Sequence, residues 1–294
     1  MGGWEVDVPG QSEFLERFTR MSRRSAAGVI STYSTSFTVA SRLLSPRIRR
    51  DIEALYAVVR IADEIVDGTA AAAGCTPGQV RGLLENYEEL VLGSLGCGFS
   101  ADPIVHAFGA TARACDFDPG LLRSFFAAMR RDLTRQVYDP RELGTYIYGS
   151  AEVIGLLCLD IFLRETDTSP ADRARMEQGA RRLGSAFQKI NFLRDRAEDA
   201  QLLGRTYLQA VGEEGKQELL LDIRADLDAA RASIPLLPLG ARAGVRAATE
   251  LYDRLLELID GAPLEELSST RIRVPASTKA GLAVTAVFKE VLRR

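Results

Sequence analysis

The sequence predicts an all-α protein built as a single domain. The chain has 294 residues, of which 46% are hydrophobic and 26% charged, and this is ample for one large domain with a deep core. Apolar residues recur at helical spacing through most of the chain. No segment alternates apolar and polar residues as a half-buried strand would, and no internal repeat has a fixed period.

Four dipeptides that join a capping residue to proline are typical of helix starts, because proline fits the first helical position. They predict helices over 47–67, 119–136, 140–164 and 170–199. Helical periodicity predicts six more, over 12–28, 79–93, 101–115, 216–232, 240–260 and 276–293. Residues 68–78 contain an alanine run and are expected to form a surface loop. We therefore expect one helical domain over 1–294, with 1–11 as a disordered or loosely attached tail.

Composition excludes several classes of function. The net charge is −3 and the pI about 5.5, so nothing indicates nucleic-acid binding. A single histidine, His106, argues against multi-histidine metal sites and histidine-based nucleophilic catalysis. The four cysteines lie far apart and read as reduced thiols. No signal peptide is apparent, and Asp160 interrupts the longest apolar run, so we expect a cytoplasmic protein.

The segment from Arg60 to Asp67 carries two carboxylates four residues apart. On a helix Asp63 and Asp67 point the same way, and Asp63 falls among apolar residues. A carboxylate on an apolar face is costly to bury unless something compensates its charge. Mg²⁺ would compensate it, because hard divalent cations bind carboxylates together with substrate phosphates. The alternative is a salt-bridged helix end, with Arg60 three residues before Asp63.

A second polar cluster lies within residues 188–199. One stripe of the predicted helix comprises Gln188, Asn191, Asp195, Glu198 and Asp199. The same helix has an apolar face and a separate basic face with Arg182, Lys189 and Arg196. A surface helix needs only one apolar and one solvated face, so a third face indicates the wall of a cavity. The alternative is that the stripe is simply the solvated side of the helix.

Together the two acidic helices indicate a mechanism. Two D-x-x-x-D pairs on separate helices can hold Mg²⁺ ions that bind a diphosphate and make it a good leaving group. The remaining wall would have to be apolar, to hold a hydrocarbon chain and to keep water away from a carbocation. The chain has no GxxxxGK[ST] loop, so this would not be a P-loop phosphate site.

Several segments, in order across about residues 30–280, resemble squalene/phytoene synthases. YSTSF (33–37), ALYA (54–57) and RIADEIVD (60–67) resemble the opening of that family, and YIYGSAEVIG (146–155) resembles its central glycine-containing helix. QKINFLRDRAED (188–199), followed by GRTYL (204–208), resembles its second aspartate motif. Tyr252 and RIRV (271–274) resemble its C-terminal segment. The long second motif is highly specific for this family.

The resemblance implies a single all-α isoprenoid-synthase domain, a helical bundle around a central cavity. It implies these ligands for Mg²⁺, or for Mn²⁺ in its place: Asp63, Asp67, Asn191, Asp195 and Asp199. The four aspartates would carry catalysis with Tyr146 and Tyr252, which would line the ionisation site. Diphosphate oxygens would be contacted by Ser34, Arg60, Gln188, Asn191, Arg194 and Arg271. The hydrocarbon chains would be bordered by Phe37, Ile154, Gly155 and Gly184.

The implied reaction joins two prenyl diphosphates head to head. One ionises, and its allylic cation alkylates the second to a cyclopropylcarbinyl diphosphate, which then ionises and rearranges to a hydrocarbon. The amino-acid sequences of residues 149–155 and 186–195 resemble those of bacterial phytoene synthases most closely. We therefore expect geranylgeranyl diphosphate as substrate and phytoene as product, the first step of carotenoid biosynthesis. NADPH is not expected, because proton loss completes that reaction and no Rossmann fingerprint is present.

Three alternatives stay open. A squalene or dehydrosqualene synthase would act on farnesyl diphosphate. A catalytically silent helical scaffold of the same fold would be expected to lose some of the four aspartates, and all four are present. A terpene cyclase usually has a different Asn/Ser/Glu pattern in its second metal motif.

Two departures from the family concern the site. Tyr33 stands where a histidine is common, which bears on one phosphate contact, and the segment after Leu208 is shortened and lacks the usual proline, which bears on the flap over the site. Residues 271–294 carry six basic residues and one acidic residue among apolar ones. They could lie on the inner face of a membrane that receives the product for a downstream desaturase. The preferred alternative is that their apolar residues pack into the core.

Overall fold

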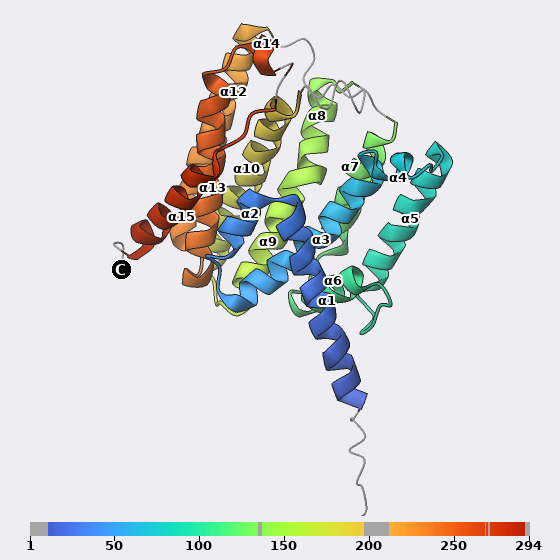
Figure 1. Cartoon of the computed structure of the whole chain (residues 1–294). Coiled ribbons are helices and arrows are strands. Elements are labelled where there is room, and N and C mark those ends of the chain that lie inside the picture. Colours follow the sequence, from blue (N-terminus) through green and yellow to red (C-terminus); the bar gives the residue numbers. More distant parts are fainter. Residues whose placement is uncertain (1–10, 135–136, 197–211, 268, 270, 292–294) are drawn as a thin grey trace, which may run out of the picture.

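The structure is a computed structural model that describes residues 11–134, 137–196, 212–267, 269 and 271–291. These residues form helices joined by short connections, with no strand among them, so the all-α prediction is confirmed (Figure 1). The helices are α1 (Gln11–Tyr33), α2 (Thr35–Ser41), α3 (Pro46–Val66), α4 (Thr69–Ala72), α5 (Pro77–Gly93), α6 (Pro103–Ala114), α7 (Pro119–Asp132), α8 (Pro140–Ile147), η1 (Tyr148–Glu152), α9 (Val153–Leu163), α10 (Pro170–Arg194), α12 (Glu213–Ser233), η3 (Ile234–Leu236), α13 (Leu239–Asp260), α14 (Leu264–Leu267) and α15 (Ala276–Val291). The expected tail lies outside the described residues, except that α1 begins at Gln11.

The proline dipeptides mark helix starts as predicted, since α3, α7, α8 and α10 all begin at their prolines. Asp118, Asp139 and Ser169 each accept a hydrogen bond from a backbone N–H of the first turn. Ser45 makes no such side-chain cap. Its backbone N–H instead donates to the carbonyl of Gly240 over 2.8 Å, which ties the start of α3 to the start of α13.

Several of the predicted helices differ in detail from the structure. The helix expected over 12–28 continues to Tyr33, and the one expected over 170–199 ends at Arg194. The helix expected over 119–136 ends at Asp132, because the N–H groups of Leu133 and Thr134 bond back only three residues and Asp139 then begins α8. The helix expected over 140–164 contains one π-helical turn, η1. We did not predict two short helices, α2, which follows α1 after a single residue, Ser34, and α4, which lies within the segment 68–78 that we expected to be a loop.

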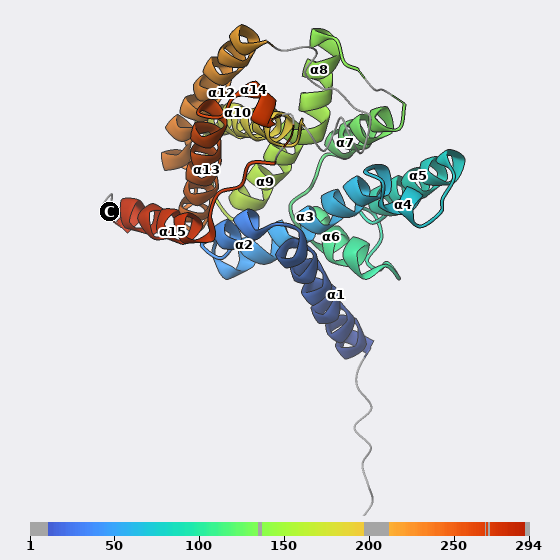
Figure 2. The same cartoon turned by 45° about the horizontal axis from the view of Figure 1, so that its top comes forward.

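The helices form two packed groups that meet where α10 packs against η1 and α9 (Figures 1 and 2). One group centres on α3 and includes α5, α6, α7 and α9, and its buried cluster contains Leu55, Phe108 and Phe126. The other consists of α10, α12 and α13, with Ile190 and Leu227 in its buried cluster. α1 extends beyond the rest of the molecule at its N-terminal end. The site predicted from sequence draws residues from both groups.

Two glycines allow α10 to approach the π-turn and α9 very closely. A Cβ atom on Gly155 would lie 2.4 Å from the carbonyl oxygen of Ala180, and one on Gly184 would lie 2.5 Å from that of Ala151. Both obstacles are backbone atoms, which cannot move aside as a flexible side chain would. Glycine is therefore required for this helix contact.

One continuous stretch, Arg141–Leu163, is long and apolar enough to cross a membrane by length and composition alone. Half of its most apolar window is buried within the protein. Glu152 and Asp160 on this stretch form ion pairs with Arg181 and Arg173 of α10, each at 2.7 Å. These contacts are those of a core helix that packs against its neighbours.

The C-terminal helix α15 packs along α13 and α2. Ala286 is buried, while Val284 and Val287 remain exposed. Glu290 pairs with Arg246 at 2.5 Å. Packing into the core, the preferred alternative, thus describes one face of this helix, and contact of its exposed face with a bilayer stays a prediction.

We predict that Gly184→Ala destabilises the protein by about 1–3 kcal/mol, because the new methyl group collides with backbone atoms. Gly82→Ala is the matched control, since Gly82 lies inside α5 with nothing within 4 Å of the added Cβ. That substitution should stabilise the protein by roughly 0.5–1 kcal/mol. Guanidinium unfolding measures both changes, and equal stability of Gly184→Ala and wild type would contradict the required close contact.

Candidate active site

Asp63 lies in the last turns of α3, between the buried residues Ala62 and Val66. Its side chain is half-buried by exposed area, yet protein surrounds the carboxyl group closely. Burial raises the pKa of Asp63 well above its usual range, and the carboxylates of Asp67 and Asp132 raise it further, while Arg60 lowers it. A carboxylate near a helix C-terminus also meets the negative end of the helix dipole. The site therefore favours a cation beside Asp63.

Arg60 does not make the ion pair that would explain Asp63 as an ordinary helix end. Its guanidinium pairs with Glu64, which also accepts a hydrogen bond from Thr69. One face of Arg60 covers the ring of Tyr33, 4.5 Å from the ring centre. Its Nε is buried and has no hydrogen-bond partner among the described residues. Tyr33, which stands where the family often has histidine, thus holds this arginine in place.

The second acidic motif lies at the C-terminal end of α10. The backbone N–H of Asp195 donates to the carbonyl of Asn191 over 2.8 Å and closes the helix. Two arginines hold the Asp195 carboxylate, Arg194 through Nε at 2.7 Å and Arg271 through Nε at 3.0 Å. Asp199 lies outside the described residues. Asp195 is therefore the one aspartate of this motif among the described residues, and two arginines neutralise its charge.

The three faces predicted for this helix each have a distinct environment. On the apolar face, Ala186, Ile190 and Leu193 are buried against α12 and α13. On the basic face, Arg182 and Lys189 pair with the buried Asp226 of α12 at 2.8 and 2.7 Å. The stripe that carries Gln188 and Asn191, here called the amide stripe, takes part in neither contact. Gln188 and Asn191 on that stripe are half-buried, which supports the interpretation of a third face that lines an interior site.

Four aromatic rings connect the two acidic helices. Phe37 of α2 lies 6.0 Å from Tyr56 of α3, 6.1 Å from Phe187 of α10 and 5.8 Å from Tyr252 of α13. Phe187 and Tyr252 stack at 3.8 Å. Tyr252 donates its hydroxyl hydrogen to Oδ1 of Asn191 over 3.3 Å. Burial raises the pKa of Tyr56 to about 12, so this cluster is uncharged near neutral pH.

Asp132 is a buried carboxylate that we did not predict. It accepts hydrogen bonds from the hydroxyl groups of Tyr146, at 2.7 Å, and Tyr138, at 3.1 Å. The ring of Tyr146 lies 6.1 Å from that of Phe192, the residue after Asn191 on α10. Asp132 also acts electrostatically on Asp63. Asp132 is therefore related to both acidic motifs, to Asp63 through its charge and to α10 through the ring of Tyr146.

Lys279 of α15 is a further cation that the sequence did not assign to the site. Its Nζ donates to Oγ1 of Thr35 over 2.6 Å, at the start of α2. Burial lowers its pKa, and the nearby cations Arg194 and Arg273 lower it further. Several cations close enough to repel one another favour an anion between them. Lys279, which belongs to the candidate membrane segment, thus lies near Arg194, one of the predicted diphosphate-binding residues.

Other predicted residues have structural partners. The hydroxyl of Ser34 caps α2 by accepting the N–H of Phe37 over 3.1 Å. Gly155 and Gly184 form the close contact between α9 and α10, and Ile154 packs against the larger core cluster. Their expected contacts with diphosphate or with hydrocarbon chains stay predictions.

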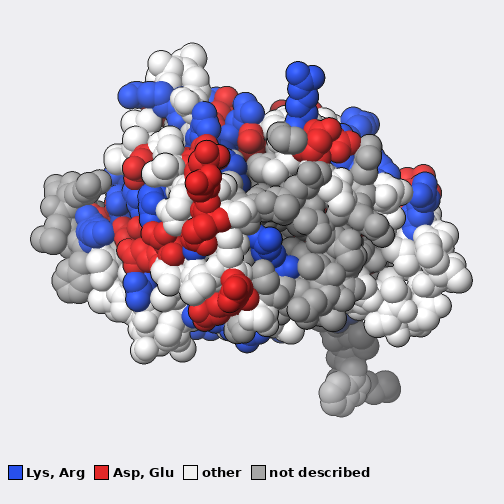
Figure 3. Space-filling model, turned by 90° about the horizontal axis from the view of Figure 1, so that it is seen from above, with Lys and Arg blue, Asp and Glu red and all other residues white. Residues whose placement is uncertain are grey.

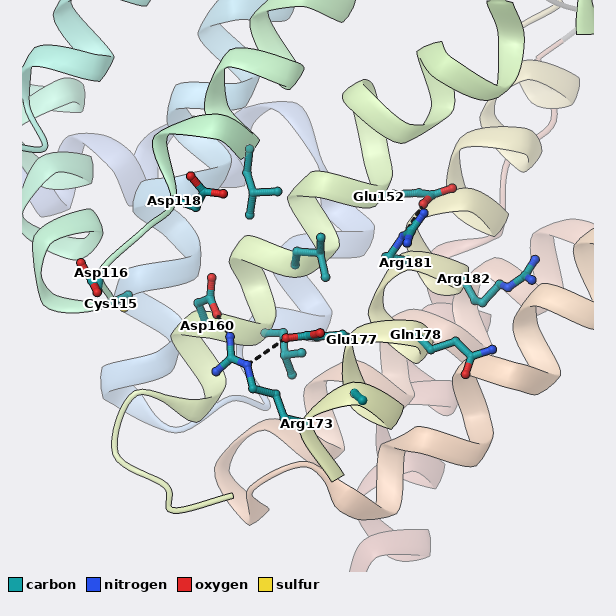
Figure 4. Close-up of a pocket in the computed structure, with 14 residues that line it drawn as sticks. Cys115, Asp116, Asp118, Glu152, Asp160, Arg173, Glu177, Gln178, Arg181 and Arg182 are labelled. Carbon is teal, nitrogen blue, oxygen red and sulfur yellow. Dashed lines mark hydrogen bonds and ion pairs between the residues drawn. The ribbon is translucent and has the colours of Figure 1, made fainter. Parts of the chain in front are cut away.

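A pocket of about 870 Å³ lies outside the predicted site, between the start of α7 and the outer faces of α9 and α10 (Figure 4). Its charged groups pair across its walls, as Arg173 does with Asp160 and Arg181 with Glu152. It contains none of the predicted site residues. This pocket, although large, is therefore not the candidate active site.

The face of the molecule seen from above mixes acidic and basic side chains (Figure 3). α3 and α10 both end toward this side in Figure 1. No broad field of one sign covers the parts of this face that Figure 3 describes, so an anion bound here would depend on individual cations such as Arg194 and Arg271.

The donor set fits a hard divalent cation in part. Asp63 is a carboxyl group whose ionised form is disfavoured without a cation, and Asp67 lies one turn further along α3. All the predicted ligands offer oxygen, which Mg²⁺ prefers. Within the described part of the chain, no three potential ligands are already gathered into a metal site. Asp63 and Asp67 thus fit one side of the site, and the full ligand set stays a prediction.

The raised pKa of Asp63 predicts a pH-dependent stability difference between wild type and Asp63→Asn. The folded protein retains the Asp63 proton at pH values where the unfolded chain has released it, so metal-free wild type loses stability as pH rises above the ordinary carboxyl range. The variant lacks this loss and should gain relative stability, by at most about 1.4 kcal/mol per pH unit. Guanidinium unfolding with a chelator, from about pH 5 to about pH 8, measures the difference, and a constant difference would contradict the prediction.

Comparison of the amino-acid sequence with known proteins places this chain in a family. The family model for squalene/phytoene synthase matches residues 30–211. The chain is 33% identical over 180 residues to phytoene synthase 3, chloroplastic, of Zea mays. This match covers 60% of the chain but only 40% of the maize protein. It is 31% identical over 258 residues to the 15-cis-phytoene synthase of Synechocystis sp., covering 79% of the chain and 74% of that protein.

Solved structures agree with this assignment at the level of the fold. A crystal structure of a dehydrosqualene synthase in complex with ligand matches with a TM-score of 0.77, covering 94% of this chain and 98% of that one at 21% identity. The isoprenoid-synthase fold expected from the resemblance is therefore confirmed. The family match covers more than half of the chain, including the first acidic motif and the whole of the second. This chain is a member of the squalene/phytoene synthase family.

Proposed function

We propose that this chain condenses two geranylgeranyl diphosphates head to head to phytoene, with release of diphosphate. One observation carries the proposal. A cluster of aromatic rings joins α3 to α10 about two turns before the acidic end of each helix, and Tyr252 of this cluster lies beside Arg194. That combination suits a substrate with an anionic head and an apolar tail, whose reaction passes through a carbocation.

The cations would hold the diphosphate groups. The buried Nε of Arg60 has no partner among the described residues, and an unsatisfied buried donor costs roughly 1–3 kcal/mol. A phosphate oxygen would satisfy it. Arg194, Arg271 and Lys279 would contact diphosphate from the opposite side, near the start of α2. Ser34, Gln188 and Asn191 would add hydrogen bonds.

The proposed metal ligands are Asp63, Asp67, Asn191, Asp195 and Asp199. When bound, Mg²⁺ would neutralise the charge that develops on the leaving diphosphate, and Mn²⁺ could take its place. At Asp63 the protein supplies a carboxyl group whose ionisation is disfavoured until a cation arrives, as its raised pKa indicates. Asp195 is held in position by Arg194 and Arg271.

The aromatic cluster would protect and stabilise the carbon skeleton during reaction. In the first stage the carbon–oxygen bond of one diphosphate breaks, and the allylic cation alkylates the second substrate with loss of a proton. In the second stage the cyclopropylcarbinyl diphosphate ionises, rearranges and loses another proton. The ring faces of Phe37, Phe187 and Tyr252 are electron-rich and exclude water, so they favour a cation over its hydrolysis.

Phytoene is chosen over a C30 product because the relatives named above at 31–33% identity are phytoene synthases, whereas the dehydrosqualene synthase shares the fold at only 21% identity. The runner-up is a squalene or dehydrosqualene synthase that uses farnesyl diphosphate. We propose no role for NADPH, since proton loss completes phytoene formation. Location in the cytoplasm, contact with the inner face of a membrane and delivery to a downstream desaturase belong to the same proposal.

The product of purified protein tests this proposal directly. The protein is incubated with Mg²⁺ and either geranylgeranyl or farnesyl diphosphate, with and without NADPH, and the hydrocarbon is identified by mass spectrometry. We expect a C40 phytoene from geranylgeranyl diphosphate, independent of NADPH.

Each other outcome has a defined meaning. A C30 hydrocarbon that appears only with NADPH would move the assignment to squalene synthase. A C30 hydrocarbon without NADPH would indicate dehydrosqualene synthase. Folded protein that yields no hydrocarbon under any of these conditions would favour the silent scaffold.

A further inference from the structure

Asp132 occupies a position that is unfavourable for a carboxylate on three counts. Its side chain is 7% exposed, so ionisation there lacks most of the stabilisation that water provides. It is the last residue of α7, at the negative end of the helix dipole. It also repels Asp63, whose pKa it raises. A costly charge of this kind beside a site calls for a functional explanation.

The hydrogen bonds of Asp132 involve both of its oxygens. Oδ2 accepts the hydroxyl hydrogen of Tyr146 at 2.7 Å, and Oδ1 accepts that of Tyr138 at 3.1 Å. A phenol has only one hydrogen to donate. Donation to Asp132 therefore fixes the torsion of the Tyr146 hydroxyl and leaves its oxygen as an acceptor toward every other neighbour.

We propose that Asp132 is a positioning residue for Tyr146. By accepting the phenol hydrogen, it keeps the Tyr146 oxygen in an acceptor state and makes that oxygen more negative, so that it stabilises positive charge on the substrate. The inference rests on the proposed function and on the role that the family resemblance implies for Tyr146, which is to line the site of ionisation. Asp132 itself need not touch the substrate.

The two tyrosines differ in their relation to the site. The ring of Tyr146 lies 6.1 Å from Phe192, next to Asn191 of the second motif. The ring of Tyr138 lies 5.0 Å from that of Tyr146, in the connection between α7 and α8. Both hydrogen bonds tie α7 to the segment that follows it, but only Tyr146 connects Asp132 with α10 by a ring contact among the described residues. Tyr138 thus provides a matched control, because it donates a hydrogen bond to the same carboxylate, that of Asp132.

A purely structural role for Asp132 gives different expectations. If the carboxylate only fastened α8 to α7, its loss would lower stability, and the two tyrosines would matter alike. If it positions Tyr146, its loss acts on turnover through that one residue. A double-mutant cycle separates these cases, because effects transmitted through one residue are not additive.

The experiment compares Asp132→Asn, Tyr146→Phe and the double variant, with Tyr138→Phe as control, in steady-state assays of hydrocarbon formation. We expect Asp132→Asn and Tyr146→Phe each to lower kcat on the order of 100-fold with little change in KM. The double variant should be no slower than Tyr146→Phe within about threefold. Tyr138→Phe should change kcat by less than about threefold. Unfolding by guanidinium, run as the same cycle, should show coupling between Asp132 and Tyr146 independent of any substrate.

Additive losses in kcat would overturn the proposal, as would equal losses from Tyr138→Phe and Tyr146→Phe or wild-type kcat in Asp132→Asn. If Asp132→Asn does not fold, Asp132→Glu replaces it, since it keeps the charge and displaces the carboxylate. Its loss of kcat must then vanish in the Tyr146→Phe background, and a loss that persists overturns the proposal. Turnover by wild type tests the proposed function and the kinetic cycle tests Asp132, so the two can fail separately.

Discussion

The carboxyl group of Asp63 lies within the apolar part of a helical bundle, and the free-energy cost of ionising it there shapes the surrounding site. Burial, Asp67 and Asp132 all oppose that charge, while Arg60 is engaged mainly with Glu64 and Tyr33. The second motif is arranged differently, because Arg194 and Arg271 already neutralise Asp195. Among the described residues, one side of the site therefore gathers several carboxylates around Asp63, whereas the other side brings two arginines to the carboxylate of Asp195. A metal–diphosphate complex carries both signs and would complement both sides.

This arrangement depends on how closely the helices pack. Gly155 and Gly184 let α9 and α10 approach until backbone meets backbone, and Phe37 fills the space among Tyr56, Phe187 and Tyr252. Asp226 holds Arg182 and Lys189 on the far side of α10, which turns the amide stripe toward the interior. The fold thus uses ion pairs outside the site to orient the polar groups inside it.

Helix positions and the two acidic motifs could be predicted because each depends on local spacing. Asp63 stood out as a carboxylate on an apolar helical face, and the prolines marked the helix starts. Asp132 could not be found this way, since its partners Tyr138 and Tyr146 follow a helix end that we placed four residues too late. Lys279 was not predicted to lie near the site for a related reason. Its contact with Thr35 joins residues 244 positions apart, and a basic residue in an apolar helix fits a membrane surface equally well.

The central claim is that the two acidic helices act jointly on one diphosphate through a divalent cation. Calorimetric titration with inorganic diphosphate, with and without Mg²⁺, tests it without requiring turnover. Wild type should bind diphosphate only with Mg²⁺, and both Asp67→Ala and Asp195→Ala should lose this binding. Asp228→Ala, which removes an exposed carboxylate of α12, should bind as wild type does. Binding that is unchanged by Mg²⁺, or that survives in either site variant, would contradict the account.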